Sequence, residues 1–452
     1  MITVMKFGGT SVGSPDALRR AVNIIINEKN DKAVVVSAMS GVTNFLVGAV
    51  DDPPSNRDEI VRQFEKKHLD AAAQVLEGEY MDGFMKEFEV RMSKFRELID
   101  SAEARKDPYY RDNVTSQGER FSSLLLAHML RAAGVRAAAL TSEDCGITAE
   151  GKPLSGSADL QRTEAQMAIN VKPYIRDGGV PVITGFYGVK DGYPLTFGRG
   201  GSDYSAAVVA NALNADVLEI WTDVDGFMSA DPRIVPDALL IDEMSFGEAA
   251  ELAYFGAKVL HPRTIEPVRM KHIPLKVKNS FRPDVPGTVI HHLRKPTKGL
   301  LKSVAMKTDL SIISIESAEI AFYPDIVGRI IGKIAENEVV IYSISTSLST
   351  VAFLVHSNDI KAVLNNLNTL STGDIERIEV KNNVALICAV GDDLLARCGV
   401  SGDIFMAVKE ARANVEMISE GASDVSLNFV VPMSKVTDVI TMLHRKYVRG
   451  DQ

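Results

Sequence analysis

Residues 3–11 read TVMKFGGTS, and this stretch decides the fold of the chain. Its first half is a short apolar strand, which runs into a Gly-Gly turn. Pro15 and Asp16 follow and predict a helix through Asn27, because proline fits the first turn of a helix. The order of strand, glycine turn and helix indicates an α/β domain.

The same pattern recurs along the first half of the chain. A β-branched run at Ala33–Val36 ends in Ser37 and a small-residue loop, Ala38–Asn44, and similar units lie at Val180–Thr184 and Val217–Thr222. Apolar strands that alternate with helices predict a largely parallel sheet that is buried on both faces.

A different pattern lies between Asp51 and Pro108. Residues Arg57–Arg105 are rich in Glu, Lys, Met, Phe and Leu at helical spacing. Acidic residues are interspersed among the basic ones, which disfavours a basic membrane-surface helix. We therefore expect a helical insertion at about 51–110 that packs on the sheet domain.

The best linker candidate is RKPTKG at residues 294–299, which would end a first domain at residue 293. After it the sequence loses its long helices and gains short Val/Ile strands. This change predicts a separate C-terminal part.

The C-terminal part contains an internal repeat at an offset of 418 − 344 = 74 residues. The offset carries Ile344-Ser345 onto Ile418-Ser419, Ile326-x-Gly328-x-Ile330 onto Val400-x-Gly402-x-Ile404, and Glu336 onto Glu410. Each copy reads strand, helix, strand, strand, helix, strand, the split βαβ arrangement of about 70 residues. We expect one copy at 300–383 and the other at 384–452, with about 300–314 as an alternative source of the second copy's first strand. A matched pair indicates a binding or regulatory unit.

Composition excludes several classes of protein. The chain has 452 residues, and 50 Lys and Arg against 59 Asp and Glu give a net charge of −9, which argues against nucleic acid or an anionic membrane as a partner. No signal peptide or membrane-spanning run is visible. The cysteines, which show no CxxC spacing, are Cys145, Cys388 and Cys398. Neither a disulfide framework nor a zinc site is expected, and a soluble, cytoplasmic protein is predicted.

The turn Lys6-Phe7-Gly8-Gly9-Thr10-Ser11 is the first candidate for chemistry. It lies between a strand and a helix, where backbone N–H groups converge on an anion. The lysine would neutralise transferring charge. An ordinary tight turn with a surface lysine is the alternative.

The second candidate is Phe197-Gly198-Arg199-Gly200-Gly201-Ser202-Asp203, in which three glycines surround one arginine. The guanidinium offers a bidentate fork for a carboxylate, and the following helix start favours an anion.

Further candidates are less specific. Asp223 and Asp225 would hold a hydrated metal or face a ribose, and they are equally typical turn formers. His261 is as consistent with a helix end as with catalysis. Residues 146–152 have the spacing of a P-loop, but Pro153 replaces the Ser or Thr that would bind Mg²⁺, so we interpret them as a loop.

Six motifs in one order carry a resemblance: KFGGTS (6–11), VVSAMSGVTN (35–44), SQGER (116–120), GRGGSDYSA (198–206), TDVDG with ADPRIV (222–235) and GAKVLHPRT (256–264). Nearly from end to end, the chain resembles the aspartate kinases. The resemblance implies an amino acid kinase-like three-layer α/β sandwich followed by two ferredoxin-like βαββαβ (ACT) domains. It also implies phosphoryl transfer from ATP to the β-carboxylate of L-aspartate, which gives 4-phospho-L-aspartate in the biosynthesis of lysine, threonine and methionine.

The resemblance implies residue roles as well. Catalysis is expected of Lys6 and Asp203, and aspartate binding of Ser37, Thr43, Glu119 (for the ammonium) and Arg199 (for the α-carboxylate). ATP binding is expected of Lys6, Gly8, Gly9, Thr10, Ser11, Thr222, Asp223, Arg233, Lys258 and Val259. An effector amino acid is expected at Asp325, Ile326, Val327, Tyr342, Ser345 and Thr346. Mg²⁺ would be held mainly through the nucleotide phosphates, without a separate metal site.

The chain departs from the family pattern in three places. Met228 replaces a tyrosine of many relatives, which removes an expected contact to adenosine. Tyr342 and Leu348 stand where lysine-inhibited relatives have acidic residues, and a buried ammonium without an acidic partner costs on the order of several kcal/mol. We therefore favour threonine over lysine as the inhibitor, although Asp325 would compensate for lysine. The paired repeats imply a homodimer or larger assembly.

Two other readings remain. The first is a kinase of the same fold that acts on glutamate or N-acetylglutamate. The SQGER motif and the paired repeats argue against this alternative. An amino-acid sensor with an inactive kinase domain is disfavoured by the intact Lys6, Arg199, Asp203 and Lys258. A fused homoserine dehydrogenase would need about 300 further residues, so length argues against it.

Overall fold

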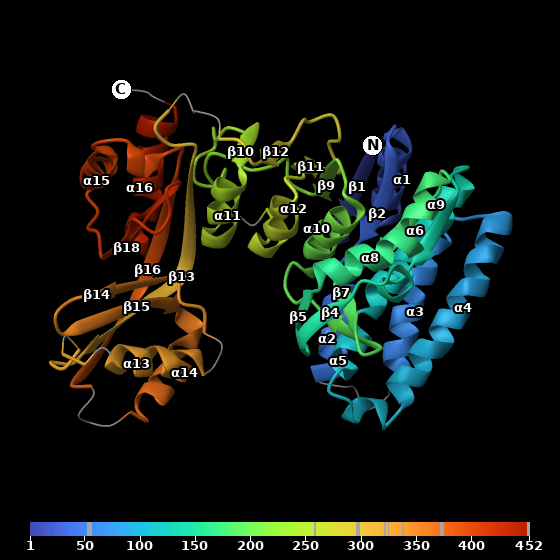
Figure 1. Cartoon of the computed structure of the whole chain (residues 1–452), viewed down its shortest axis with the longest axis horizontal. Coiled ribbons are helices and arrows are strands. Elements are labelled where there is room, and N and C mark those ends of the chain that lie inside the picture. The colour runs from blue at the N-terminus through green and yellow to red at the C-terminus, as the bar shows by residue number, and fades with distance from the viewer. Residues whose placement is uncertain are drawn as a thin grey trace. The chain divides into compact units, whose positions relative to one another are not determined.

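The computed structural model describes residues 1–51, 57–256, 259–294, 299–320, 322–323, 325–336, 339–370 and 375–449. The chain forms two compact units, which are drawn in Figure 1. Unit 1 comprises Met1–Phe227, Asp242–Phe246 and Val259–Leu293, and unit 2 comprises Met228–Ile241, Gly247–Lys258 and Arg294–Gln452. Two short segments before residue 293 thus group with the C-terminal part, which differs from the predicted boundary. Of the predicted linker, residues 295–298 lie outside the described residues.

A mainly parallel sheet forms the centre of unit 1. In the described part of the chain it has eight strands in the order β10-β12-β11-β9-β1-β2-β6-β3. They are β1 (Ile2–Phe7), β2 (Asp31–Val36), β3 (Ala137–Leu140), β6 (Val180–Thr184), β9 (Val217–Thr222), β10 (Glu243–Ser245), β11 (Leu275–Asn279) and β12 (Thr288–His291). β1 pairs in parallel with β2 and β9, and only the β11–β12 pairing is antiparallel among those described. The predicted parallel sheet is confirmed.

Helices cover both faces of this sheet, so unit 1 is the expected three-layer sandwich. They are α1 (Pro15–Asn27), α2 (Val42–Asp51), α3 (Asp58–Ala72), α4 (Gly78–Asp100), α5 (Tyr110–Thr115), α6 (Gln117–Ala132), α7 (Ser142–Cys145), α8 (Leu160–Asn170), α9 (Lys172–Arg176), α10 (Gly201–Leu213) and α12 (Ile265–Met270). Met5 and Phe7 of β1 point into a core with α1 and α6. Lys6 lies between them in the sequence and points to the opposite face, where α10 packs.

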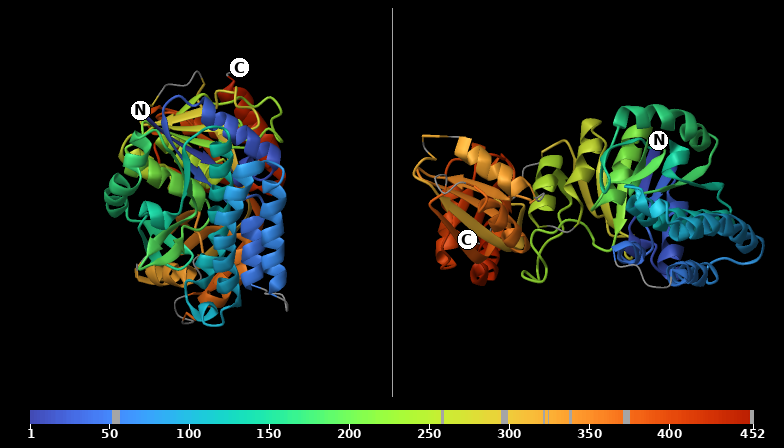
Figure 2. Two further views of the ribbon diagram at one scale, coloured as in Figure 1. Left: turned by 90° about the vertical axis from the view of Figure 1, so that its right-hand side faces the viewer. Right: turned by 90° about the horizontal axis from the view of Figure 1, so that it is seen from below.

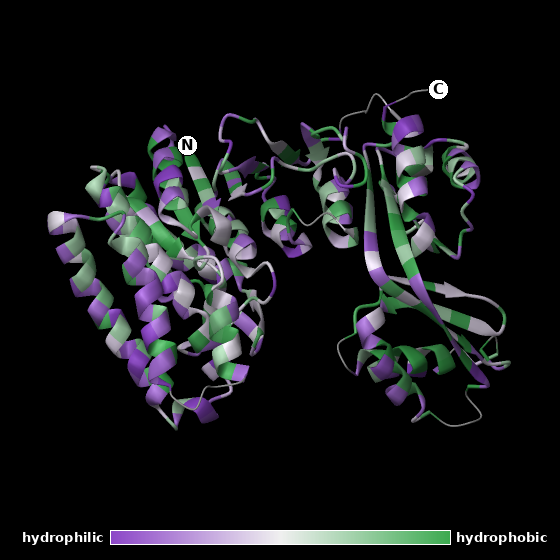
Figure 3. Ribbon diagram, turned by 180° about the vertical axis from the view of Figure 1, so that it is seen from behind, coloured by the Kyte–Doolittle hydropathy of each residue, from purple (hydrophilic) through white to green (hydrophobic). Residues whose placement is uncertain are grey.

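The segment between β2 and β3 is helical. Figures 1 and 2 show α3 and α4 as long neighbouring helices, and Figure 3 shows hydrophilic and hydrophobic residues alternating along them. Phenylalanines fill their inner surface, with the ring centroid of Phe64 4.5 Å from that of Phe95 and 4.9 Å from that of Phe121. Aromatic packing therefore attaches the insertion to α6.

Two antiparallel hairpins complete unit 1. β4 (Ala149–Lys152) pairs with β5 (Ser155–Ala158), and β7 (Tyr187–Lys190) pairs with β8 (Tyr193–Thr196). Gly146, with a φ of +75°, caps α7. Residues 146–152, which have P-loop spacing, are thus a helix cap and a strand.

Unit 2 is built on an antiparallel sheet. Its six described strands have the order β14-β15-β13-β16-β18-β17. They are β13 (Ser303–Glu316), β14 (Ser343–Thr346), β15 (Thr350–His356), β16 (Arg377–Val390), β17 (Met417–Ser419) and β18 (Ser426–Pro432). The helices are α11 (Phe246–Phe255), which begins in unit 1, and α13 (Asp325–Ala335), α14 (Ile360–Leu367), α15 (Val400–Glu410) and α16 (Val436–Leu443). Ile330 and Ile404, which the repeat matches, are both fully buried on α13 and α15.

The two copies of the repeat are not separate along the chain. The predicted boundary at 383/384 falls inside β16, and the Ser303–Lys307 half of β13 pairs with the second half of β16. Asp309 and Asn383 have φ angles of +60° and +57° where the halves of β13 and β16 meet. Asp and Asn tolerate this left-handed conformation, so each strand continues from one copy into the other.

Candidate active site

The carboxyl ends of the central strands meet at one edge of the unit 1 sheet. Phe7 at the end of β1 lies level with Val36 of β2 and Trp221 of β9. The Ser37 N–H donates to the Phe7 carbonyl at 3.1 Å. The glycine turn, Ser37 and Thr222 therefore come together, at the edge where open α/β sheets bind ligands.

Lys6 and Asp203 form a buried ion pair at this edge. Their Nζ and Oδ1 atoms are 2.5 Å apart, and 8% and 17% of the two side chains are exposed. Asp203 lies in the first turn of α10, so helix packing aims its carboxylate at β1. The arrangement presents a fixed, largely desolvated cation to an anionic ligand.

The glycine turn is shaped for close approach. The Gly8 N–H donates to the Trp221 carbonyl at 3.1 Å. A Cβ at Gly9 would lie 3.0 Å from the carbonyl oxygen of Ala38, and one at Gly8 would lie 3.4 Å from Nζ of Lys6. Glycine at position 8 therefore keeps the space beside the lysine ammonium free, and glycine at position 9 permits the close approach of the Ala38 carbonyl.

Ser11 and Thr10 differ in their exposure. The Ser11 hydroxyl is buried, 3.2 Å from the Trp221 carbonyl and 2.7 Å from the Ser280 hydroxyl. Ser280 in turn donates its N–H to Thr222 at 2.8 Å. Ser11 thus ties the turn to the ends of β9 and β11, whereas Thr10 is exposed.

Glu119 is a buried carboxyl in the first turn of α6, with 2% of the residue exposed. Burial raises its pKa to about 8, against the opposing effects of the Ala38 N–H, the Lys6 charge and the Ser202 hydroxyl. No hydrogen-bond partner for its Oε2 is found among the described residues. A carboxyl with a free oxygen and a perturbed pKa is suited to a cationic ligand group.

Thr43 directly follows Val42, which packs beside Gly118. It is half-buried in the first turn of α2. A Cβ at Gly118 would lie 2.5 Å from the Ala38 Cβ and 3.0 Å from a Val42 methyl. The start of α6 therefore packs on the start of α2, and glycine permits this contact.

The loop with Arg199 is held in an unusual backbone conformation. Gly198 and Gly200 have φ angles of +73° and +72°, which side chains rarely adopt. Arg199 between them is exposed, and no side-chain partner for its guanidinium is recorded in the described residues. A free guanidinium at the start of α10 is available for a carboxylate.

Two residues of the GAKVLHPRT motif support this loop. A Cβ at Gly200 would lie 2.3 Å from that of His261, whose side chain caps the short helix Pro262–Thr264. Burial is the main cause of a lowered pKa for His261. Arg263 donates to the Phe197 carbonyl at 2.9 Å and to the Gly156 carbonyl at 2.7 Å. His261 is thus a helix-end residue, and Arg263 attaches the loop to β5.

Asp112 is a further support that the sequence did not indicate. It is fully buried on α5 and accepts hydrogen bonds from the N–H and hydroxyl of Thr196, each at 2.7 Å. It also accepts from the Leu154 N–H at 3.0 Å. Asp112 therefore fixes the end of β8, directly before the Arg199 loop.

The TDVDG segment continues the site beyond β9. The Thr222 hydroxyl donates to the Asp223 carboxylate at 3.2 Å, and Asp223 is exposed. Asp225 instead pairs with Arg282 and accepts from the Asn279 amide at 2.7 Å. The two aspartates thus have different roles, because only Asp223 is open to a ligand. Val259 is half-buried in unit 1.

Some of the expected residues belong to unit 2. Arg233 lies in unit 2, exposed and bidentate to Asp231 at 2.6–3.1 Å, and Lys258 lies outside the described residues. The expected effector residues are all in unit 2, on α13 and on β14 with the residue before it. Asp325 is exposed and 3.3 Å from Arg329, and the Tyr342 ring lies 4.4 Å from Nζ of Lys307.

The described residues contain no group of three or more His, Cys, Asp or Glu side chains placed to hold a metal. In the same residues, no helix is long and apolar enough to cross a membrane.

Comparison with known proteins relates the whole chain to one group. A model of the amino acid kinase family matches residues 1–279, and an ACT domain model matches 387–447. The lysine-sensitive aspartokinase 3 of Escherichia coli is 33% identical over 98% of both chains. The structure of E. coli aspartokinase III with aspartate and ADP superposes with a TM-score of 0.83 at 31% identity, covering 98% of this chain and 99% of that one. The structure with lysine and aspartate gives 0.84 at 31% identity over 99% of both chains. The chain also spans about half the length of bifunctional plant aspartokinase/homoserine dehydrogenases.

Proposed function

This chain belongs to the aspartokinases of the amino acid kinase family, and from this membership we propose the roles of its individual residues. The enzyme transfers a phosphoryl group from ATP to the β-carboxylate of L-aspartate, and its ACT domain makes it a candidate for feedback regulation. Carboxylate attack on a phosphoryl group needs alignment and charge neutralisation more than a strong base.

The ion pair of Lys6 and Asp203 carries the assignment of the catalytic centre. Lys6 would neutralise the charge that develops on the transferred phosphoryl group. Asp203, 2.5 Å away, would hold and orient the ammonium. Their burial raises the strength of both effects, because little water screens them.

Aspartate would be held by groups of opposite charge at its two ends. The carboxylate of Glu119 would accept the α-ammonium, and the exposed fork of Arg199 would bind the α-carboxylate. Ser37 directly follows β2, and Thr43 lies in the first turn of α2. Both would contribute hydroxyl contacts to aspartate. The β-carboxylate is then left to face Lys6.

The nucleotide would lie over the glycine turn. Gly8, Gly9 and Thr10 would approach the phosphates, with Ser11 holding the turn in shape, and Thr222 with Asp223 would contact the nucleoside. Arg233, Lys258 and Val259 are proposed nucleotide contacts on the motif resemblance alone. Mg²⁺ would be held chiefly by the phosphates, and it supplies charge neutralisation there.

Trapping with hydroxylamine tests the function. ATP-dependent acyl phosphate should form with L-aspartate and not with glutamate or N-acetylglutamate. A preference for either of the other two acceptors would contradict the substrate assignment.

The effector is proposed to be threonine, although the E. coli relative is lysine-sensitive by name. Lys307 already places an ammonium against the Tyr342 ring, so an effector ammonium there would meet a like charge. Asp325, the acid named as a possible partner for lysine, is paired with Arg329. Threonine needs only a hydroxyl partner, for which Ser345 and Thr346 are exposed on β14.

Inhibition curves at fixed aspartate decide between the two effectors. Threonine should inhibit at lower concentration than lysine. Strong inhibition by lysine with none by threonine would overturn the proposal. A homodimer or larger assembly and a cytosolic location stay predictions.

A further inference from the structure

A cavity lies in unit 1 outside the set of residues proposed for the active site. Its volume is about 750 Å³. Its wall consists of one side of α4, the residues around the start of α6, residues 141–144 and the turn between β7 and β8. None of the residues assigned to aspartate or ATP lines it, although Arg120 in its wall directly follows Glu119.

Four cations and three carboxylates line this cavity: Lys86, Arg91, Lys94 and Arg120 against Glu87, Glu143 and Asp144. The carboxylates already have partners. Glu87 is 3.0 Å from Arg131, which lies outside the cavity wall. Asp144 accepts the N–H and hydroxyl of Thr141, each at 2.8 Å.

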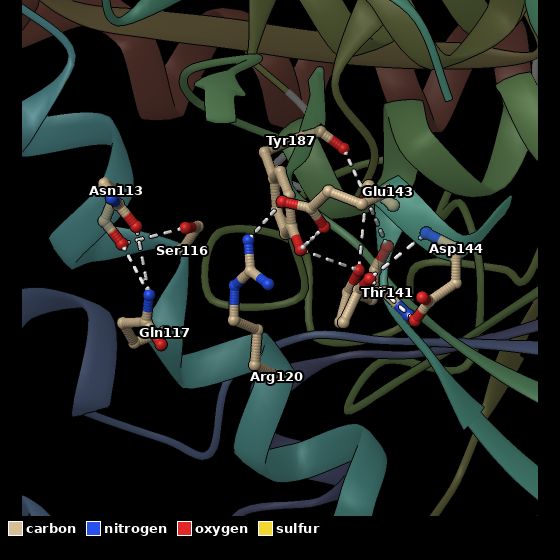
Figure 4. A network of polar contacts seen from close by, with 10 residues as sticks. Asn113, Ser116, Gln117, Arg120, Thr141, Glu143, Asp144 and Tyr187 are labelled. Carbon is tan, nitrogen blue, oxygen red and sulfur yellow. Dashed lines mark hydrogen bonds and ion pairs between the residues drawn. The ribbon is translucent and has the colours of Figure 1, made fainter. Parts of the chain in front are cut away.

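Glu143 is engaged on both oxygens. Figure 4 shows the Arg120 side chain extending from α6 toward Glu143 and Tyr187. One Glu143 oxygen is 2.5 Å from Arg120, and the other accepts the Tyr187 hydroxyl at 2.9 Å. The Arg120 guanidinium also lies 4.9 Å from the centre of the Tyr187 ring. This pair neutralises itself.

The remaining three cations are not neutralised in this way. No carboxylate within ion-pair distance of Lys86, Arg91 or Lys94 is recorded in the part of the chain that the structure describes. Arg91 is only half-exposed and donates to the Arg120 carbonyl. Burial is the main cause of its lowered pKa, and the charges of Glu87 and Asp144 oppose this effect.

We propose that this cavity binds a small polyanion that carries phosphate or carboxylate groups. The planar fork of Arg91 is suited to either group in bidentate geometry, and the two lysines add charge at the rim. The amides of Asn113 and Gln117, which hydrogen-bond each other at 3.2 Å, add polar groups to the wall. An anion there would be a counter-charge for Lys86, Arg91 and Lys94, which have no carboxylate within ion-pair distance among the described residues.

Calorimetric titration of the full chain tests the proposal without measuring activity. Pyrophosphate and citrate represent the two chemistries, and glucose is the uncharged control. The double variant Lys86→Gln/Lys94→Gln should weaken binding of the preferred anion about tenfold, and Arg91→Lys, which keeps the charge but loses the fork, should weaken it as well. Arg120 is left unchanged because it adjoins Glu119.

The matched control is Lys29→Gln/Lys66→Gln, which removes two exposed lysines of unit 1 outside the cavity. It should bind like the wild type. Pyrophosphate bound at the ATP site would persist in the cavity variants, so equal binding by all proteins overturns the proposal. Absence of binding of both anions at millimolar concentration also overturns it.

Discussion

Glu119→Gln should raise the free energy of unfolding of the ligand-free protein and should weaken its binding of aspartate. The carboxyl is 2% exposed, and burial raises its pKa from 4.5 to about 8. At pH 7 the unfolded chain ionises this group, whereas the folded protein keeps it largely protonated. The lost ionisation disfavours folding by roughly 3 kcal/mol at pH 7, a cost that the neutral amide does not carry.

The sign of the pH dependence follows from the raised pKa. The folded state binds the proton more tightly than the unfolded state, so the contribution of Glu119 to stability falls as pH rises from 4.5 to about 8 and is constant above. Aspartate binding has the opposite dependence, because its ammonium needs the ionised carboxylate. Wild-type affinity for aspartate should therefore rise up to tenfold per pH unit until about pH 8.

Thermal unfolding and steady-state kinetics measure both effects. At pH 7 the variant should melt about 5 °C higher without ligands, and its KM for aspartate should rise on the order of 10²–10³-fold with no pH dependence below 8. Glu97→Gln on the exposed side of α4 is the control and should change neither. A destabilised Glu119→Gln variant, or a flat wild-type KM profile between pH 6 and 8, would refute the reasoning.

Three further substitutions test the rest of the site. Lys6→Ala should lower kcat on the order of 10²–10³-fold with the melting temperature kept within a few degrees, and near wild-type turnover would contradict its role. Arg199→Lys should raise the KM for aspartate far more than that for ATP, since lysine lacks the bidentate fork; equal changes would move Arg199 to the nucleotide site. Asp112→Asn should cost about 1–3 kcal/mol in thermal or denaturant unfolding, because its amide group would face the N–H donors of Thr196 and Leu154. The variant should also raise the KM for aspartate by a larger factor than the KM for ATP. A purely structural loss would not discriminate between the two substrates in this way.

Much of the site is predictable because its signals are local. Lys6 adjoins a glycine turn at a strand end, and Arg199 lies among glycines at a helix start, so each indicates an anion site by itself. Ser202 belongs to the GRGGSDYSA motif, but only the folded chain brings its hydroxyl to the Glu119 carboxyl. No local sequence pattern indicated a role for Asp112, because its hydrogen-bond partners Leu154 and Thr196 lie 42 and 84 residues away in the sequence.

The C-terminal half shows the same division. The 74-residue offset predicted two copies of one motif, and the equivalent residues Ile330 and Ile404 are indeed buried alike. The sequence also allowed about 300–314 as the source of the second copy's first strand, and residues 303–307 do pair with 386–390, so β13 and β16 each serve both copies. Strand exchange depends on pairing between residues 303–307 and 386–390, and no local pattern encodes a partner so distant in sequence.

The sequence by itself determined the alternation of strands and helices, the glycine turns and the family, because hydrophobic periodicity and backbone freedom are properties of neighbouring residues. Only the tertiary structure decided which charges are paired. Lys6 forms an ion pair with Asp203. Among the described residues, Oε2 of Glu119 has no hydrogen-bond partner, and Arg91 has no carboxylate within ion-pair distance. The energy of a charge depends on its burial and on the groups within a few ångströms, and folding sets both.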